Sequence, residues 1–337
     1  MVNVDLIIVI VFLLVNLMIG IAKSGNVENI KEYALGSRNF NTSTLVATIA
    51  ATWIGGGVFG QTLSETYKQG LYFIIPAIGD SLVLMVFGIF FVPGMVRYLG
   101  SLSIAETMGT IYGNKVKAIT GIIALLSCIG VVAVQFKVNA TLFKLFFGIS
   151  SFYAVFASAI IVIIYSSLGG IRAVSFTDVT QIFTFGVIVP ILSIIIWHGS
   201  ANPENVFQII STNDNFNLAK IFKFNNTKIA GQTMSFDVTA TIEPTTFQRI
   251  SMAKNISQAR RACVIASFVC LVISLVTMWV AVLLLYKSPN LDADNLVGHI
   301  IDNYSYTGLK GLIAIGIMSI AMSSADSYMN TASIIIT

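Results

Sequence analysis

Long apolar runs, separated by short polar stretches, dominate the pattern of this chain. A helix that crosses a hydrocarbon core of about 30 Å needs roughly 20 mostly apolar residues. Nine windows approach or exceed that length, and we predict a membrane-spanning helix in each. The windows are 5–22, 44–68, 71–97, 118–146, 151–169, 174–198, 229–247, 260–286 and 309–337. The pattern therefore predicts an all-α, polytopic membrane protein.

Two stretches depart from this pattern. The window 229–247 contains Gln232, Asp237 and Glu243, so neighbouring helices must shield it if it spans the membrane. The polar, Asn-rich stretch 199–228 is typical of a long loop, and we expect a short interfacial helix within it.

Composition supports a membrane location. The chain is 56% hydrophobic and only 10% charged, whereas an average soluble domain is about 25% charged. The mean hydropathy is +0.86.

The first apolar run, from Leu6 to Ile21, follows no basic segment and ends at no small-residue cleavage site, so we expect a retained helix rather than a signal peptide. The net charge of +4 is ordinary for such a protein, so we expect the lipid bilayer, and not nucleic acid, as a partner.

Basic residues gather in alternate loops. Cytoplasmic loops of membrane proteins carry an excess of Lys and Arg. The set comprises Lys23, Lys31, Arg38, Arg97, Lys115, Lys117, Arg172, Arg249, Lys254, Arg260 and Arg261. We therefore predict a multi-pass protein of the cell membrane whose N-terminus lies on the extracellular or periplasmic side.

Three consecutive glycines interrupt the second window, within Ala51-Thr-Trp-Ile-Gly-Gly-Gly57. Glycine destabilises a helix interior by about 1 kcal/mol relative to alanine. Small residues can also allow close packing between membrane helices. The alternative is an unwound turn whose free carbonyls bind a cation and whose half-helix ends face a solute. Trp53 beside these glycines could stack on a cationic solute or simply pack.

The final window concentrates polar side chains in an apolar helix. Such groups are costly in hydrocarbon unless they face a partner, water or an ion, so they indicate a coordination site. The eight polar residues are Ser319, Ser323, Ser324, Asp326, Ser327, Asn330, Thr331 and Ser333.

Two further motifs lie near predicted cytoplasmic turns. In Gly169-Gly-Ile-Arg-Ala-Val-Ser-Phe-Thr-Asp178, the glycines would end one helix and Asp178 would cap the next, or its carboxylate would lie on an inner ion path. The segment Glu243-Pro-Thr-Thr-Phe-Gln-Arg249 indicates a helix end at the cytoplasmic face, where Arg249 would anchor the interface.

These motifs together resemble the sodium:solute symporter family, which includes transporters of proline, pantothenate, sugars, iodide and choline. The resemblance is carried, in order, by Ala51-Thr-Trp-Ile-Gly-Gly-Gly57, Gly169 to Gln181, Phe247-Gln-Arg249 and Ala321-Met-Ser-Ser-Ala-Asp-Ser327. The first motif is most similar to the choline-transporter branch.

The resemblance implies a leucine-transporter-like fold, in which one leading helix precedes two inverted five-helix repeats. The leading helix would be 5–22 and the first repeat 44–198, and the second repeat would begin at 229 with only three helices before Thr337.

The resemblance also implies a sodium site between the glycine-broken helix and the serine-rich helix. Its ligands would be the carbonyls of Ala51, Ile54 and Ile320 and the hydroxyls of Ser323 and Ser324. Asp178 would match an acidic residue on the family's inner sodium route. The solute site would include Trp53, Gly55, Gly56, Asp80 and Glu243.

Asp80 and Glu243 depart from the choline branch, which has aromatic residues at or near these places. Two acids would suit a solute whose amine donates hydrogen bonds. Alternatively, the two acids would simply face the extracellular and cytoplasmic vestibules.

We therefore predict a symporter that couples sodium entry to uptake of a small organic solute: a choline-like amine, an amino acid or a pantothenate-like compound. Sodium is the coupling ion, and we expect no other cofactor. The alternatives are a truncated or split, inactive symporter and a transporter-like sensor module. No nucleophile–base pair or phosphate loop is evident in the sequence, so we do not expect an enzyme.

Overall fold

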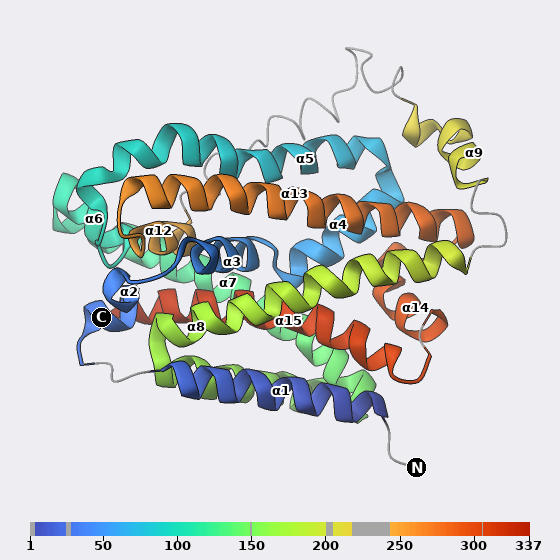
Figure 1. The fold of residues 1–337 in the computed structure, drawn as a ribbon, viewed down its shortest axis with the longest axis horizontal. Coiled ribbons are helices and arrows are strands. Elements are labelled where there is room, and N and C mark those ends of the chain that lie inside the picture. Colours follow the sequence, from blue (N-terminus) through green and yellow to red (C-terminus); the bar gives the residue numbers. More distant parts are fainter. Residues whose placement is uncertain (1–3, 25–27, 149, 200–204, 218–242, 305) are drawn as a thin grey trace.

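The computed structural model describes residues 4–24, 28–148, 150–199, 205–217, 243–304 and 306–337. Every regular element in these residues is helical (Figure 1). The α-helices are α1 (Val4–Lys23), α2 (Ile30–Leu35), α3 (Thr42–Trp53), α4 (Gly56–Gln69), α5 (Leu71–Val86), α6 (Ile104–Tyr112), α7 (Asn114–Phe147), α8 (Ser151–His198), α9 (Asn205–Thr212), α12 (Pro244–Ser251), α13 (Ile256–Lys287), α14 (Leu296–Asn303) and α15 (Leu309–Ile336).

The long helices run roughly along one direction, as expected for a bundle that crosses a bilayer (Figure 1). Among the described residues, six helices are long and apolar enough to cross a membrane, or seven if the bent pair α3–α4 forms one span. Helices are confirmed in the predicted windows 5–22, 71–97, 118–146, 260–286 and 309–337. The window 71–97 is helical throughout, but α5 continues as a π-helical turn and a 3₁₀ segment to Tyr98.

The predicted loop between windows 151–169 and 174–198 is shorter than expected. Helical geometry fails only at Gly170, whose φ is +53° and ψ is −149°. A Cβ atom there would lie 2.8 Å from the carbonyl oxygen of Tyr33, so the kink also allows α2 to pack closely. The predicted turn is thus a sharp change of direction within α8.

The predicted span 229–247 lies outside the described residues except for its last part. That part begins the short helix α12 at Pro244, a residue favoured in the first turn of a helix. The short helix expected within 199–228 is present as α9.

Helix α15 is the central helix of the bundle. Every residue from 313 to 328 is buried, and the helix packs against α8, α7, α1 and α3. The buried Asp5 of α1 fixes its first turn, because the carboxylate Oδ1 accepts the amides of Gly308 at 2.9 Å and Gly311 at 2.7 Å. This central position gives the polar side chains of α15 partners inside the protein, which lipid could not supply.

The two ends of the bundle differ in their elements. Helices α2, α6 and α12 lie at one end with the C-terminus of the chain, and α9 and α14 lie at the other end (Figure 1). Helix α1 finishes at the basic Lys23, on the same side of the bundle as α2, α6 and α12. The positive-inside rule predicts that this side is cytoplasmic.

Candidate functional site

The predicted break in the second window is present. Helix α3 ends at Trp53, α4 begins at Gly56, and the two are bent by 57°. The amide of Ile54 donates to the carbonyl of Ala50 at 3.0 Å. The carbonyls that follow Ala50 belong to the last turn of α3, where backbone carbonyls have no amide partner within the helix. Carbonyls in such a turn are suited to bind a small cation.

The glycines also permit close packing, so both interpretations of the motif apply. A Cβ atom on Gly55 would lie 2.9 Å from Ser324 Oγ, and one on Gly56 would lie 2.9 Å from the Cβ of Ala321. Small side chains of α15 therefore pack directly against the backbone of the break.

Gln135 on α7 holds the start of α4. Its Oε1 accepts the amide of Gly56 at 2.9 Å, and its side chain is almost fully buried. Sequence analysis did not single out this residue. The available signal was a side-chain amide in the apolar window 118–146, because polar groups inside a membrane are expensive.

The five predicted sodium-binding positions are all buried. Among them, Ser324 contacts the break, as the glycine geometry shows. Its Oγ has no hydrogen-bond partner among the described residues. A buried hydroxyl without a partner costs about 1–3 kcal/mol, so this oxygen favours a ligand that it can bind.

Ser323, next to it, donates to the carboxylate Oδ1 of Asp178 at 2.7 Å. Thr48 of α3 donates to Oδ2 of the same carboxylate. The Nη2 of Arg249 lies 3.7 Å from Oδ2, and both charged side chains are fully buried. Asp178 therefore joins the broken helix α3 and helices α8, α12 and α15.

One of the two interpretations of Asp178 and the interpretation of Arg249 are wrong. Asp178 does not cap a helix, because it lies within α8, well past the kink at Gly170. Arg249 does not anchor the interface, because it is one of the largest fully buried side chains of the protein. A buried guanidinium requires anionic partners, and Asp178 is one of them.

A second link connects α3, α12 and α15. Arg249 Nη2 donates to Ser327 Oγ at 2.5 Å, and Thr52 Oγ1 lies 3.0 Å from the same oxygen. Asp326 is buried and also interacts electrostatically with Arg249. One guanidinium and the two carboxylates of Asp178 and Asp326 give this buried cluster a formal charge of −1 when all three are ionised.

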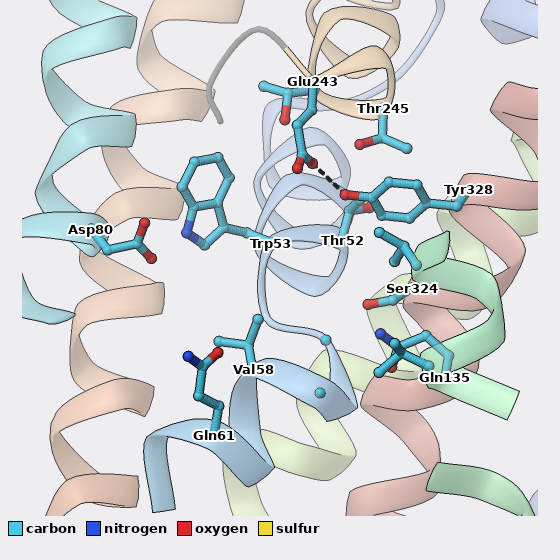
Figure 2. A pocket seen from close by; sticks show the side chains of 15 residues that line it. Thr52, Trp53, Val58, Gln61, Asp80, Gln135, Glu243, Thr245, Ser324 and Tyr328 are labelled. Atoms are coloured by element: carbon cyan, nitrogen blue, oxygen red, sulfur yellow. Dashed lines mark hydrogen bonds between the residues drawn. The ribbon is translucent and has the colours of Figure 1, made fainter. Parts of the chain in front are cut away.

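A cavity of about 370 Å³ opens beside the break. Figure 2 shows Trp53, Asp80, Glu243 and Tyr328 directed toward it from α3, α5, the start of α12 and α15. Its lining comprises Thr52, Trp53, Gly55, Gly57, Val58, Gln61, Asp80, Val131, Val134, Gln135, Glu243, Thr245, Thr246, Ser324 and Tyr328. Four of the five predicted solute-binding residues therefore line one space, whereas Gly56 belongs to the adjoining packing contact.

The two acids lie in the same cavity rather than in separate vestibules. Glu243 accepts the phenolic hydroxyl of Tyr328, which holds its carboxylate in place (Figure 2). Asp80 is among the more exposed residues of α5. Tyr328 is a further lining residue that sequence analysis missed, although it stands within the serine-rich helix.

Hydrogen bonds tie together the end of the bundle that the positive-inside rule predicts to be cytoplasmic. Arg38 donates to the carbonyl of Ala253 at 2.8 and 2.6 Å and to that of Lys254 at 3.0 Å. Gln248 Nε2 donates to the carbonyl of Ala34 at 3.0 Å and to Asn330 Oδ1 at 2.9 Å. These contacts join the α2 region to α12 and α15.

Comparison with known protein families gives an extended match. The model of the sodium:solute symporter family matches residues 33–337. A solved structure described as the substrate-bound outward-open state of a Na⁺-coupled sialic acid symporter aligns with a TM-score of 0.90 at 19% sequence identity. The alignment covers 99% of this chain and 74% of that chain, so the two share a fold.

Two curated relatives align over about half of this chain. The high affinity choline transporter 1 of Homo sapiens is 31% identical over 187 residues, which are 53% of this chain and 32% of that protein. The sodium-coupled monocarboxylate transporter 1 of Xenopus laevis is 24% identical over 181 residues, 53% of this chain and 29% of that protein. These alignments therefore span about a third of the length of each relative.

Proposed function

Because this chain belongs to the sodium:solute symporter family, we propose that it is a secondary transporter that couples sodium entry to the uptake of a small organic solute. The proposal rests on one observation above all: a buried serine hydroxyl without a partner faces the broken helix α3–α4. Sodium binds there, and the solute binds in the adjoining cavity.

The proposed sodium ligands are the carbonyls of Ala51, Ile54 and Ile320 with the hydroxyls of Ser323 and Ser324. A hard monovalent cation prefers oxygen ligands of this kind, and a helix break supplies the carbonyls. The hydrogen of Ser323 is engaged by Asp178, which leaves lone pairs of its oxygen for the ion.

Coupling follows from the position of the bound sodium ion next to the bound solute. The break forms one wall of the cavity, so an ion that fixes α3 and α4 against α15 also fixes Trp53, Gly55 and Ser324 around the solute. Each ligand therefore binds more tightly when the other is present, and the effect is reciprocal. Movement of the surrounding helices about this site would expose it to one side of the membrane and then to the other.

Asp178 is proposed to lie on the inner ion path. The formal charge of −1 on the cluster of Asp178, Asp326 and Arg249 attracts a cation that leaves the site between α3 and α15. Thr48 and Ser327 add hydroxyl oxygens beside this cluster.

The test is sodium-dependent stability of purified protein carrying Ser324→Ala. In sodium-free potassium buffer the variant should be more stable than the wild type by about 1 kcal/mol, because it removes a buried group without a partner. In sodium the order should reverse, and the half-saturating sodium concentration should rise about tenfold or more, since about 1.4 kcal/mol corresponds to a factor of ten.

Ser333→Ala is the matched control, because its hydroxyl donates to the carbonyl of Asn330 within α15 and lies outside the cavity. A sodium response of Ser324→Ala that equals the wild-type response would contradict the proposed site. Sodium-driven uptake into proteoliposomes then tests transport itself.

A further inference from the structure

We propose that the solute is an organic ammonium ion that carries N–H donors and no carboxylate group. This inference rests on the proposed function, since it concerns the solute cavity beside the sodium site. The observations that support it are the charge of the cavity lining, the placement of its two acids and the small number of its aromatic side chains.

The described lining residues carry charge of one sign. Asp80 and Glu243 are acidic, and none of the lining residues in the described part of the chain is basic. The nearby guanidinium of Arg249 does not line the cavity, because it is fully buried against Asp178 and Ser327. Two carboxylates around a space of about 370 Å³ therefore favour a cation and repel an anion.

The two acids reach the cavity from different elements. Asp80 belongs to α5, and Glu243 precedes the first residue of α12. In Figure 2 the indole of Trp53 lies between Asp80 on one side and Glu243 with Tyr328 on the other. A solute on the indole face would thus have a carboxylate on either side and an aromatic surface for its positive charge.

Carboxylates and aromatic rings select different cations. A quaternary ammonium has no N–H group and is best held by a cage of aromatic rings. Here Trp53 and Tyr328 are the two aromatic residues among the described lining residues. A primary or secondary ammonium, by contrast, donates charge-assisted hydrogen bonds to carboxylate oxygens. The hydroxyls and amides of the lining, such as those of Gln61 and Thr245, suit the polar remainder of a small amine.

A zwitterion or an organic acid fits this lining poorly. Its carboxylate would need a cationic partner, and the described lining carries two carboxylates and no basic side chain. Rejection through an unpaired buried charge is an effective source of specificity.

Three probes that share the two-carbon amino alcohol skeleton separate these possibilities: ethanolamine, choline and serine. Choline is ethanolamine with its three ammonium hydrogens replaced by methyl groups, and serine is ethanolamine with a carboxylate added. Binding is measured by calorimetry on the purified full chain in sodium and in potassium. Ethanolamine should bind about tenfold or more tightly than either analogue.

Two charge-neutral variants identify the groups responsible. Asp80→Asn and Glu243→Gln should each weaken ethanolamine binding about tenfold or more and reduce its advantage over choline. Asp302→Asn is the control, because this exposed acid pairs with Lys310 outside the cavity, and its ethanolamine affinity should stay within about twofold of the wild type.

The proposal is overturned if choline or serine binds as tightly as ethanolamine, or if neither acid variant weakens ethanolamine binding. It is also overturned if no ethanolamine binds while sodium still stabilises the protein, and in that case the sodium site stands. Ethanolamine binding that is strong but equal in sodium and potassium supports the cationic solute and contradicts the coupling.

Discussion

Removal of the Arg249 guanidinium, as Arg249→Met, should destabilise the protein strongly. The side chain and its partner Asp178 are both fully buried, with Nη2 and Oδ2 3.7 Å apart. At this distance and an effective dielectric of about 20, the attraction is about 4.5 kcal/mol. Loss of one partner of a buried pair typically costs about 3–5 kcal/mol, because the other charge remains without compensation. We expect a loss of that size in sodium-free buffer.

The variant should also respond more strongly to sodium than the wild type. Without the guanidinium, the carboxylates of Asp178 and Asp326 carry two negative charges, and a sodium ion can compensate one of them. The free energy of unfolding is measured by SDS titration in dodecyl maltoside micelles, with tryptophan fluorescence as the signal, in sodium and in potassium.

The double variant Arg249→Met/Asp178→Asn provides the control, because it removes both charges of the pair. It should recover at least half of the lost stability, since no unpaired charge remains at Asp178. A double variant as unstable as Arg249→Met, or a single variant within about 1 kcal/mol of the wild type, would refute this account of the pair.

Three further predictions follow from single contacts. Gln135→Leu leaves the amide of Gly56 without its acceptor and should weaken sodium binding about fivefold or more, as measured by sodium-dependent melting. Arg38→Ala removes hydrogen bonds to two carbonyls and should increase solute-independent sodium leak in proteoliposomes. Asp5→Ala removes the carboxylate that accepts two amides at the start of α15 and should cost about 1–2 kcal/mol of unfolding free energy.

Each of these predictions has a conservative counterpart. Gln135→Glu keeps an acceptor oxygen and should bind sodium better than the leucine variant, whereas equal loss in both would argue against the hydrogen bond. Arg38→Lys retains a donor and should leak less than the alanine variant. Asp5→Asn keeps an acceptor oxygen, so a loss equal to that of Asp5→Ala would show that the two amides do not explain its contribution.

Apolar length predicted the long helices of this protein, because bilayer thickness imposes the same requirement on each of them. The break at Gly55 and Gly56 was also predictable, since consecutive glycines weaken a helix wherever they occur. The serines of α15 pointed to a coordination site for the same physical reason: hydroxyl groups in an apolar helix need partners.

Contacts between distant segments could not be predicted in this way. Arg249 was expected at the membrane interface because arginine in an isolated sequence is best solvated there, and the packing of α12 against α3 and α15 brings it to Asp178. Gln135 gave no local signal of its partner, because the amide that it accepts belongs to a different helix. The bundle, rather than any one motif, determines these pairs.

The glycine contact between α4 and α15 also has an evolutionary consequence. A Cβ atom at Gly56 would lie 2.9 Å from the Cβ of Ala321, and one at Gly55 would displace the hydroxyl of Ser324, so this contact resists substitution. Other lining side chains, from α5 and from the start of α12, include Asp80 and Glu243; they lie outside that contact and can be exchanged without disturbing it. Substitutions at these positions can therefore change the preferred solute, while the proposed sodium site beside the glycine contact is retained.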